Sequence, residues 1–317
     1  MKYKVFIDGK EGTTGLQIYD RFKDREDIEL ILIDDELRKD VNERRKCINA
    51  SDVTFLCLPD QAAIEAVELL DYNNKHTKII DASTAHRTLA NWAYGFPELD
   101  DYYLNKIKTN QFIAVPGCYA SGFQAIIYPL VKGNILPFKY PVSVNAISGY
   151  SGAGKKGIAQ YEDDNRSAEF DAPRLYAMTQ NHKHLKEMKA ISGLAQEPLF
   201  NPYVCDFYKG MLVTIPLYLD KLNKRLTLKE IHDYYVKYYE GKELIRVMPL
   251  EEKGTQSGFL SANHLAGKDY LEIYISGNDD RISITACLDN LGKGASGAAI
   301  ECMNIALGLD LKTSLNL

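Results

Sequence analysis

The chain has 317 residues, and its 38 Lys and Arg against 43 Asp and Glu give a formal net charge of −5. Hydrophobic residues make up 45% and charged residues 26%, which is ordinary for a globular protein and excludes a disordered or fibrous one. At about 100–200 residues per domain, the length predicts two domains. The mild acidity argues against a nucleic-acid-binding protein, which usually has a basic face.

The cellular compartment follows from the N-terminus and the cysteines. No apolar run of about 18 residues predicts a membrane span, and the first residues lead into a strand pattern instead of the apolar core of a signal peptide. The six cysteines form neither a CxxC pair nor a cysteine–histidine cluster with zinc-ligand spacing. We therefore expect a cytoplasmic protein with no membrane contact, no metal site and mostly buried thiols.

The first hundred residues alternate between strand and helix patterns. The expected strands are nearly continuous apolar runs at residues 2–8, 28–33, 53–58 and 78–81, and the expected helices are at 14–22 and 61–70. Apolar strands separated by helices are typical of a parallel sheet covered on both faces.

A glycine pattern stands between the first strand and the first helix. The spacing is GxxGxxG, formed by Gly9, Gly12 and Gly15, with Thr13 and Thr14 inside it. Glycine permits a tight turn and lets a pyrophosphate approach the backbone amides at a helix N-terminus. Within a strand–helix–strand pattern it predicts a dinucleotide-binding loop; an ordinary glycine turn is the alternative.

The residues after the second strand leave the choice between NAD and NADP open. Asp34 and Asp35 favour NAD, because an acidic side chain there can bind the ribose 2′-hydroxyl. Basic residues follow that can either hold a 2′-phosphate or form a solvated charged loop, namely Arg38, Lys39, Arg44 and Arg45.

The second half of the chain has longer strands and fewer helices. A helix is expected at 119–130, and a capping box, Thr227 with Glu230, opens another. The expected strands are at 142–148, 210–219, 270–276 and 281–288, before a last helix at 294–307. This half therefore reads as an α+β domain with a mixed or antiparallel sheet.

Two further glycine-rich segments are weighed against nucleotide binding. Residues 149–156 nearly spell a phosphate-binding loop, but Lys156 stands where a Ser or Thr should bind magnesium. Residues 292–297 spell GxGxxG, but too few residues follow for a strand–helix–strand unit of about 30 residues. We expect the second segment to do something else, such as letting a helix N-terminus approach a ligand.

Cys118 is the expected nucleophile. It follows Pro116-Gly117 and begins a helix pattern, so it lies at a helix N-terminus, where the dipole and the free amides favour a thiolate. The same amides can stabilise an oxyanion on a bound acyl group.

The expected acid or base is a histidine of the 182–184 cluster, with Glu187 able to orient it. His182 and His184 are two positions apart, so on a helix they face different ways and do not form the i,i+4 pair of a zinc site. A cysteine beside a nicotinamide site indicates a thioester that is reduced to an aldehyde, or the reverse.

Six motifs in order carry a family resemblance. They are the glycine pattern at 9–15, Asp-Ala-Ser-Thr-Ala-His-Arg at 81–87, Pro-Gly-Cys-Tyr at 116–119, Ser-Gly-Ala-Gly at 151–154, His-Lys-His with Glu at 182–187, and Asp-Asn-Leu-Gly-Lys-Gly-Ala-Ser-Gly at 289–297. Together they resemble N-acetyl-gamma-glutamyl-phosphate reductases of arginine biosynthesis, specifically the shorter type. Val115 and Ala120, where longer members have Asn and Pro, fit that type.

The resemblance implies an α/β protein with a Rossmann domain, residues 1–117 completed by a C-terminal helix at 290–317, and a glyceraldehyde-3-phosphate-dehydrogenase-like α+β catalytic domain, residues 118–289. It implies NADPH, attack by Cys118 on an acyl phosphate, and His182 as acid/base, supported by Tyr176 and Glu187. The implied further cofactor contacts are Arg38, Ser83, Thr84, Asn290 and Gly292. The expected substrate contacts are Ser148, Lys155 and Arg174; Lys155 departs from the family's usual Arg.

Two other readings remain to be compared. An aspartate-semialdehyde dehydrogenase shares the fold and the cysteine mechanism but lacks the His-x-His arrangement. A non-catalytic NADP-binding paralogue would need neither Cys118 nor His182. The expected partners are a small acyl-phosphate substrate and further copies of the chain, as a dimer or tetramer. The sequence leaves open whether the N-acylated substrate is free or attached to a carrier.

Overall fold

The computed structural model describes residues 2–251 and 254–317. These residues form two compact units. The first contains the chain as far as Gly117 together with Ala295–Leu315, and the second contains Cys118–Gly294 with Asn316–Leu317. Residues 290–294 and 316–317, which we expected to go with the first domain, thus belong to the second unit in this division.

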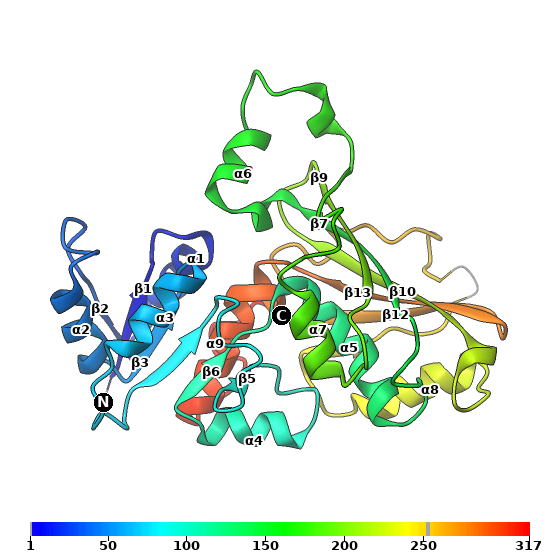
Figure 1. Ribbon diagram of the computed structural model, residues 1–317, viewed down its shortest axis with the longest axis horizontal. Helices are drawn as coiled ribbons and strands as arrows, with labels where there is room; N and C mark the ends of the chain where they lie inside the picture. The colour runs from blue at the N-terminus through cyan, green and yellow to red at the C-terminus, as the bar shows by residue number, and fades with distance from the viewer. Residues whose placement is uncertain (1, 252–253) are drawn as a thin grey trace. The chain divides into compact units, whose positions relative to one another are not determined.

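The first unit is built on a parallel sheet of six strands in the order β2-β1-β3-β4-β6-β5 (Figure 1). All of its neighbouring strands pair in parallel. The strands are β1 (Tyr3–Asp8), β2 (Ile28–Ile31), β3 (Val53–Leu56), β4 (Lys78–Asp81), β5 (Ala93–Tyr94) and β6 (Phe112–Ala114). The helices are α1 (Thr13–Phe22), α2 (Val41–Ala50), α3 (Asp60–Glu68), α4 (Asp101–Thr109) and α9 (Gly297–Leu307).

Both faces of this sheet are buried, as the continuous apolar strands predict. Val5 and Ile7 of β1 pack in one core cluster, with residues of α1 and α9. Phe6, between them, points to the other face and packs with residues of α2 and α3. The period of two along a strand thus supplies apolar side chains to both helical layers.

Helix α2 is the main departure from the expected elements of this unit. The segment with the basic residues 38–45 is only partly a loop, because a helix begins at Val41. The carboxylate of Asp40 caps it by accepting the backbone N–H groups of Asn42 and Glu43, each at 2.9 Å. Ile48 is its only buried residue, so the apolar periodicity was too weak to predict the helix.

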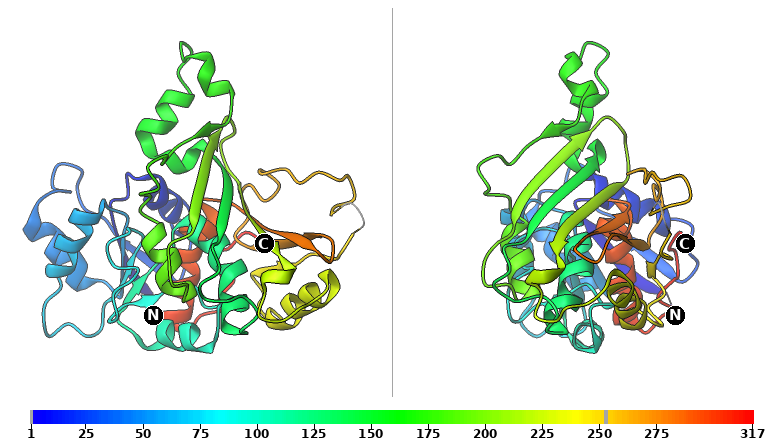
Figure 2. Two further views of the ribbon diagram at one scale, coloured as in Figure 1. Left: turned by 45° about the vertical axis from the view of Figure 1, so that its right-hand side comes forward. Right: turned by 90° about the vertical axis from the view of Figure 1, so that its right-hand side faces the viewer.

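The second unit contains a mixed sheet of seven strands in the order β11-β12-β13-β10-β7-β9-β8. The strands are β7 (Ser143–Gly149), β8 (Arg174–Leu175), β9 (Leu199–Cys205), β10 (Met211–Tyr218), β11 (Ile245–Val247), β12 (Leu271–Gly277) and β13 (Arg281–Leu288). The helices are α5 (Cys118–Lys132), α6 (Gly154–Tyr161), α7 (Leu185–Ser192) and α8 (Leu228–Tyr238). Figure 2 shows the segment with α6 projecting beyond the ends of β7 and β9.

Helix α5 is the buried centre of this unit and packs against the sheet. A Cβ on Gly122 would come within 2.7 Å of Val213 Cγ2 on β10, so only glycine allows this approach. Pro129 lies inside α5 and has no N–H for the carbonyl of Ala125. The hydroxyl of Tyr239, just after α8, donates to that carbonyl at 2.8 Å. The predicted capping box at Thr227 and Glu230 is confirmed at the start of α8.

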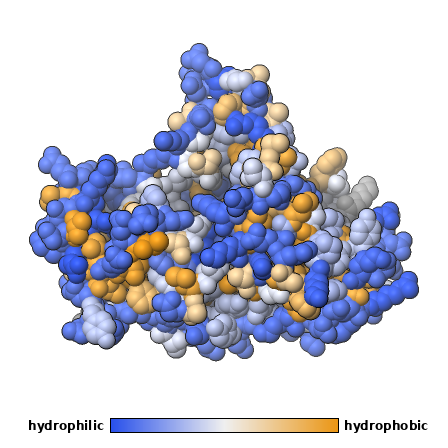
Figure 3. Space-filling model, viewed as in Figure 1, coloured by the Kyte–Doolittle hydropathy of each residue, from blue (hydrophilic) through white to orange (hydrophobic). Residues whose placement is uncertain are grey.

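Among the residues that the structure describes, no helix is long and apolar enough to cross a bilayer. On the face drawn in Figure 3, hydrophilic side chains predominate and hydrophobic residues form separate patches.

Candidate active site

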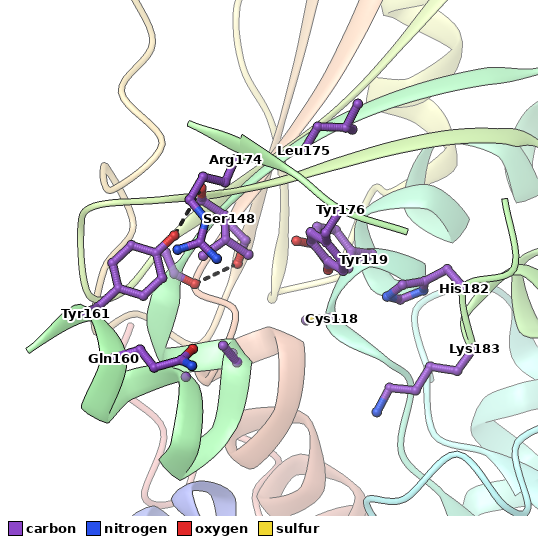
Figure 4. Close-up of a pocket in the computed structure, with 15 residues that line it drawn as sticks. Cys118, Tyr119, Ser148, Gln160, Tyr161, Arg174, Leu175, Tyr176, His182 and Lys183 are labelled. Atoms are coloured by element: carbon purple, nitrogen blue, oxygen red, sulfur yellow. Dashed lines mark hydrogen bonds between the residues drawn. The ribbon is translucent and has the colours of Figure 1, made fainter. Parts of the chain in front are cut away.

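Cys118 is the first residue of α5, as its position after Pro-Gly predicts. Its side chain is half-buried, and it lines a cavity of about 330 Å³ in the second unit (Figure 4). No acidic residue lies in the first turn of α5, so the positive end of the helix dipole faces the thiol without an opposing carboxylate on the helix. This is the environment that favours a nucleophilic thiolate.

His182 lines the same cavity and is held by aromatic rings. Its ring centroid lies 5.7 Å from that of Tyr176, 5.9 Å from that of Tyr119 and 5.1 Å from that of Phe200, each in an edge-on arrangement. The structure corrects one expectation: His182 precedes α7, and its ring packs against that of His184 at 4.7 Å instead of facing away from it.

The tautomer of His182 follows from a backbone contact. The N–H of His184 donates to Nδ1 of His182 at 3.1 Å. Because Nδ1 accepts, the proton of the neutral ring is on Nε2. Nε2–H can therefore donate a hydrogen bond to an oxygen that gains negative charge.

Two tyrosines and a serine continue the cavity wall from His182. Burial raises the pKa of Tyr119 well above its usual value. The charges of Tyr176 and Cys118 and a hydrogen bond to Tyr176 add to this rise, and a hydrogen bond to Ser148 opposes it. Burial likewise raises the pKa of Tyr176. These hydroxyls are thus neutral hydrogen-bonding groups near neutral pH, and the Ser148 hydroxyl donates to the carbonyl of Gly149 at 3.1 Å.

Arg174 forms part of the wall on the side of Tyr161. Its guanidinium carbon lies 3.9 Å from the ring centroid of Phe170 and 5.5 Å from that of Tyr161. Nη1 of Arg174 is buried and has no hydrogen-bond partner within the described residues. Gln160 lines the cavity nearby, as Figure 4 shows.

Not every residue that was predicted from the sequence lines the cavity. Lys155 is exposed on α6 and is not among the lining residues. Glu187 is buried in the first turn of α7, and its backbone carbonyl accepts from the Gln124 side chain at 3.3 Å. Conversely, Lys183 lines the cavity and was not predicted, because nothing in the local sequence distinguishes it from a solvated lysine.

Asn290 joins two of the motifs within the second unit. Its amide nitrogen donates to Ser151 Oγ at 2.8 Å, and its amide oxygen accepts from the backbone N–H of Gly210 at 2.9 Å. Two of its hydrogen-bonding positions are therefore used inside the protein. Gly292 is buried, and a Cβ there would lie 2.1 Å from the carbonyl oxygen of Lys268.

The glycine loop of the first unit fits a bound pyrophosphate. The N–H of Gly12 donates to Gly9 at 2.9 Å, and Gly9 has a φ of +87°, so the chain turns tightly. A Cβ on Gly15 would lie 2.5 Å from the carbonyl oxygen of Gly9. Gly12 caps α1 without a side-chain hydrogen bond, and no acidic residue occupies the first turn, so the helix end is open to an anion. Thr13 and Thr14 are its first two residues.

The loop after β4 is held by two carboxylates. Asp81 accepts the N–H and hydroxyl of Ser83, at 2.9 and 2.7 Å, and Nδ1 of His86 at 2.6 Å. Asp60 accepts the N–H of Thr84 at 2.8 Å and also its hydroxyl. The hydroxyls of Ser83 and Thr84 thus donate inside the protein and can only accept from a ligand.

The basic residues after β2 have different surroundings. Arg44 pairs with Asp8 at 2.8 Å, and both side chains are largely buried. Arg45 pairs with Asp71 at 2.9 Å on the surface. Arg38 and Lys39 are exposed in the turn between β2 and α2. Of the described residues here, these two are therefore the ones placed to meet an added phosphate.

Comparisons with known proteins agree with the motifs. Residues 118–290 match the family model for the semialdehyde dehydrogenase dimerisation domain. The chain is 47% identical to N-acetyl-gamma-glutamyl-phosphate reductase 2 of Nostoc sp., over 97% of this chain and 98% of the relative. It is 46% identical to the N-acetyl-gamma-glutamyl-phosphate reductase of Sinorhizobium medicae, over 97% and 99%. The chain belongs to the N-acetyl-gamma-glutamyl-phosphate reductase family.

The family predicted from the six motifs is thereby confirmed, and with it an oxidoreductase that uses a pyridine nucleotide. The predicted activity is the one that the relatives' names state.

Solved structures support the fold class. The chain resembles aspartate semialdehyde dehydrogenase II of Vibrio cholerae with a TM-score of 0.69 over 97% of this chain and 99% of that one. A similar enzyme from Francisella tularensis also matches with a TM-score of 0.69, over 96% and 99%. Identities of 14% and 15% make this a likeness of fold alone. The predicted fold class, a Rossmann-type parallel sheet with a second α+β unit, is confirmed.

Proposed function

We propose that this protein reduces N-acetyl-gamma-glutamyl phosphate to N-acetylglutamate 5-semialdehyde and phosphate through a thioester on Cys118, with NADPH as the reductant. One observation carries the mechanism: Cys118, at the start of a buried helix, shares a cavity with His182. In this proposal residues 1–117, completed by the C-terminal helix, bind the dinucleotide, and residues 118–289 carry the chemistry.

The thiolate forms a bond from Sγ to the acyl carbon, and the bond from that carbon to the phosphate oxygen breaks. Inorganic phosphate leaves and takes the one proton that the overall reaction consumes. NADPH, when bound, supplies the hydride that reduces the thioester carbon. Nε2–H of His182 donates to the former acyl oxygen while that oxygen is negative. The carbon–sulfur bond then breaks, which releases the semialdehyde and restores the thiolate.

Tyr176 supports this role of His182, because its ring packs edge-on against the imidazole at 5.7 Å. Glu187 is also proposed to support His182. It lies in the first turn of α7, and His184 is the residue that directly precedes this helix. Ser148 and Arg174 are proposed substrate contacts because both line the cavity. Lys155 is also a proposed substrate contact, although its exposed side chain lies outside the cavity lining.

The choice of NADPH rests on the residues after β2. Arg38 is proposed to bind the 2′-phosphate, since it is exposed while Arg44 is engaged by Asp8. Gly9, Gly12, Thr13, Thr14 and Gly15 are proposed to hold the pyrophosphate. Ser83, Thr84, Asn290 and Gly292 complete the proposed cofactor contacts. We further propose a cytoplasmic homo-oligomer, a dimer or tetramer, in keeping with the dimerisation domain that the family model names.

The reverse reaction tests the proposal. Purified protein is mixed with NADP⁺, phosphate and N-acetylglutamate semialdehyde, and NADPH absorbance is followed. Parallel samples contain aspartate semialdehyde, or NAD⁺ in place of NADP⁺. Phosphate-dependent NADPH formation with the acetylated aldehyde alone is the expected result. Equal or faster turnover of aspartate semialdehyde would contradict the proposed substrate, and equal rates with NAD⁺ would contradict the proposed cofactor.

A further inference from the structure

The cavity around Cys118 contains two basic side chains besides His182. They are Arg174 and Lys183, and the lining contains no acidic side chain. The proposed substrate carries two anionic groups, a carboxylate next to the N-acyl nitrogen and an acyl phosphate at the far end of a short carbon chain. Two basic side chains thus stand against two anionic groups of opposite sign, so the question is which cation meets which anion.

Arg174 is fixed before any ligand arrives. Its guanidinium lies against the face of Phe170 at 3.9 Å, and the segment that carries Phe170 is tied down by Arg166. Arg166 bonds Asp206 at 2.6 Å, Asp171 at 2.8 Å and the carbonyl of Tyr161 at 2.6 Å. A planar guanidinium with a buried, unbonded Nη1 is suited to a planar carboxylate, which accepts two parallel hydrogen bonds.

Lys183 has the opposite character. It is exposed, and among the described residues its ammonium group is in no ion pair. It follows His182 directly, and Figure 4 shows the two side chains on one side of Cys118 with Arg174 on the other. A lysine is a compact point charge that does not impose a planar partner, so it suits a tetrahedral phosphate.

The two anionic groups of the substrate lie at different distances from the nucleophile. The phosphate is bonded to the same carbon that Sγ attacks, so it must lie beside Cys118, whereas the carboxylate lies several bonds away. We propose that Lys183 binds the phosphate of the acyl phosphate, and inorganic phosphate in the reverse reaction, while Arg174 binds the substrate carboxylate. This inference rests on the proposed function and names the residues that distinguish the two anionic ends of its substrate.

Steady-state kinetics of the reverse reaction separates the two roles. Lys183→Ala is expected to raise KM for phosphate about tenfold or more, the effect of losing one hydrogen bond between charged groups, while KM for the semialdehyde changes less than about twofold. Arg174→Leu is expected to do the reverse. Lys183→Arg, which keeps the charge, should recover most of the phosphate affinity. Lys186→Ala is the matched control, because Lys186 is exposed on α7 and outside the cavity lining.

A second readout does not need turnover. Broadening of the phosphorus resonance of inorganic phosphate is measured with wild-type protein and with each variant, and thermal unfolding verifies that each is folded. The expected result is broadening by wild type and Lys186→Ala and its loss in Lys183→Ala. The assignment would be overturned by unchanged phosphate broadening and phosphate KM in Lys183→Ala, or by a phosphate defect in Arg174→Leu alone. Inactivity of wild-type protein, with phosphate broadening that is lost in Lys183→Ala, would instead count against the proposed function and leave the assignment of phosphate to Lys183 standing.

Discussion

Gly294 packs directly against Cys118. A Cβ on Gly294 would lie 2.8 Å from the Cβ of Cys118, closer than Cβ atoms approach other atoms in folded proteins, and 3.0 Å from the carbonyl oxygen of Asp289. This contact explains the second glycine pattern, which the sequence identified as something other than a dinucleotide loop. Its middle glycine lets a turn of backbone pass beside the nucleophile.

Gly294→Ala therefore tests how finely Cys118 is positioned. The added methyl group must move either Cys118 or the 289–294 turn, and displacement of a reacting atom by about 1 Å can lower turnover about a hundredfold. We expect at least a tenfold loss of turnover, with NADPH binding retained. The check is kcat together with NADPH fluorescence titration; wild-type turnover would show that the contact relaxes without consequence.

Much of this site was predictable because its signals are local. Cys118 was predicted as the nucleophile because it follows Pro-Gly and begins a helix pattern, and both of these signals come from adjacent residues. Lys183 was missed because its significance comes from the 176–184 segment passing beside the start of α5. Gly294 was recognised as a special glycine, but its reason is a contact with a residue 176 positions away along the chain. Long-range contacts of this kind leave no periodic trace in the sequence.

The fold shows the same difference between elements with local sequence signals and elements that depend on long-range contacts. The buried strands of the first unit were predicted well because they are nearly continuous apolar runs. In β3, Thr54 is the one polar residue from Val53 to Leu56, and all four residues are buried. Helix α2 was missed because it buries one side chain and is otherwise charged. Its formation depends on the Asp40 cap and on the ion pair of Arg44 with Asp8, and the second of these is a tertiary interaction.

Alkylation should distinguish Cys118 from the other thiols by pH. Burial raises the pKa of Cys47 and Cys205, and raises that of Cys287 to about 12. A raised thiol pKa means that the reactive thiolate is scarcer at a given pH, so these cysteines should resist iodoacetamide at pH 7. We expect peptide mapping to find Cys118 alone modified at pH 7, with Cys47 following above pH 9. Modification of several cysteines at equal rates would refute a selectively activated Cys118.

Replacing the nucleophile should separate chemistry from cofactor binding. In Cys118→Ser the hydroxyl is a far weaker nucleophile than a thiolate, so turnover should nearly vanish, while NADPH titrates as in wild type. His182→Asn should lower kcat by about a hundredfold or more, the usual range for loss of a general acid. Retained activity in the serine variant would contradict the thioester mechanism. Wild-type rates in the asparagine variant would show that His182 is not the general acid.

The hydroxyl of Tyr239 should stabilise the fold independently of catalysis. Tyr239→Phe leaves the carbonyl of Ala125, already deprived of its helical partner by Pro129, without this buried hydrogen bond. The expected loss is about 1–3 kcal/mol in the free energy of unfolding, measured by urea denaturation. Tyr72→Phe is the control, because Tyr72 is 86% exposed. Equal effects of the two substitutions would show that the Tyr239 hydroxyl contributes nothing specific.

The ion pair behind the glycine loop should make stability depend on pH in a defined direction. Burial raises the pKa of Asp8, which directly precedes Gly9, and the hydrogen bond and charge of Arg44 oppose that rise. In Arg44→Ala the opposing interactions are lost, so the folded-state pKa of Asp8 should rise further. An acid whose pKa is higher in the folded state binds its proton more tightly there, so stability falls as pH rises from the unfolded value through the folded one.

We therefore expect Arg44→Ala to lose about 3–5 kcal/mol of unfolding free energy at pH 7.5 and clearly less at pH 4.5, where Asp8 can become neutral. Urea denaturation of wild type and variant at both pH values is the measurement. Asp8→Asn combined with Arg44→Ala should remove this pH dependence, because no buried carboxylate remains to be ionised. A destabilisation of equal size at both pH values would mean that Arg44 acts by packing and not through the charge of Asp8.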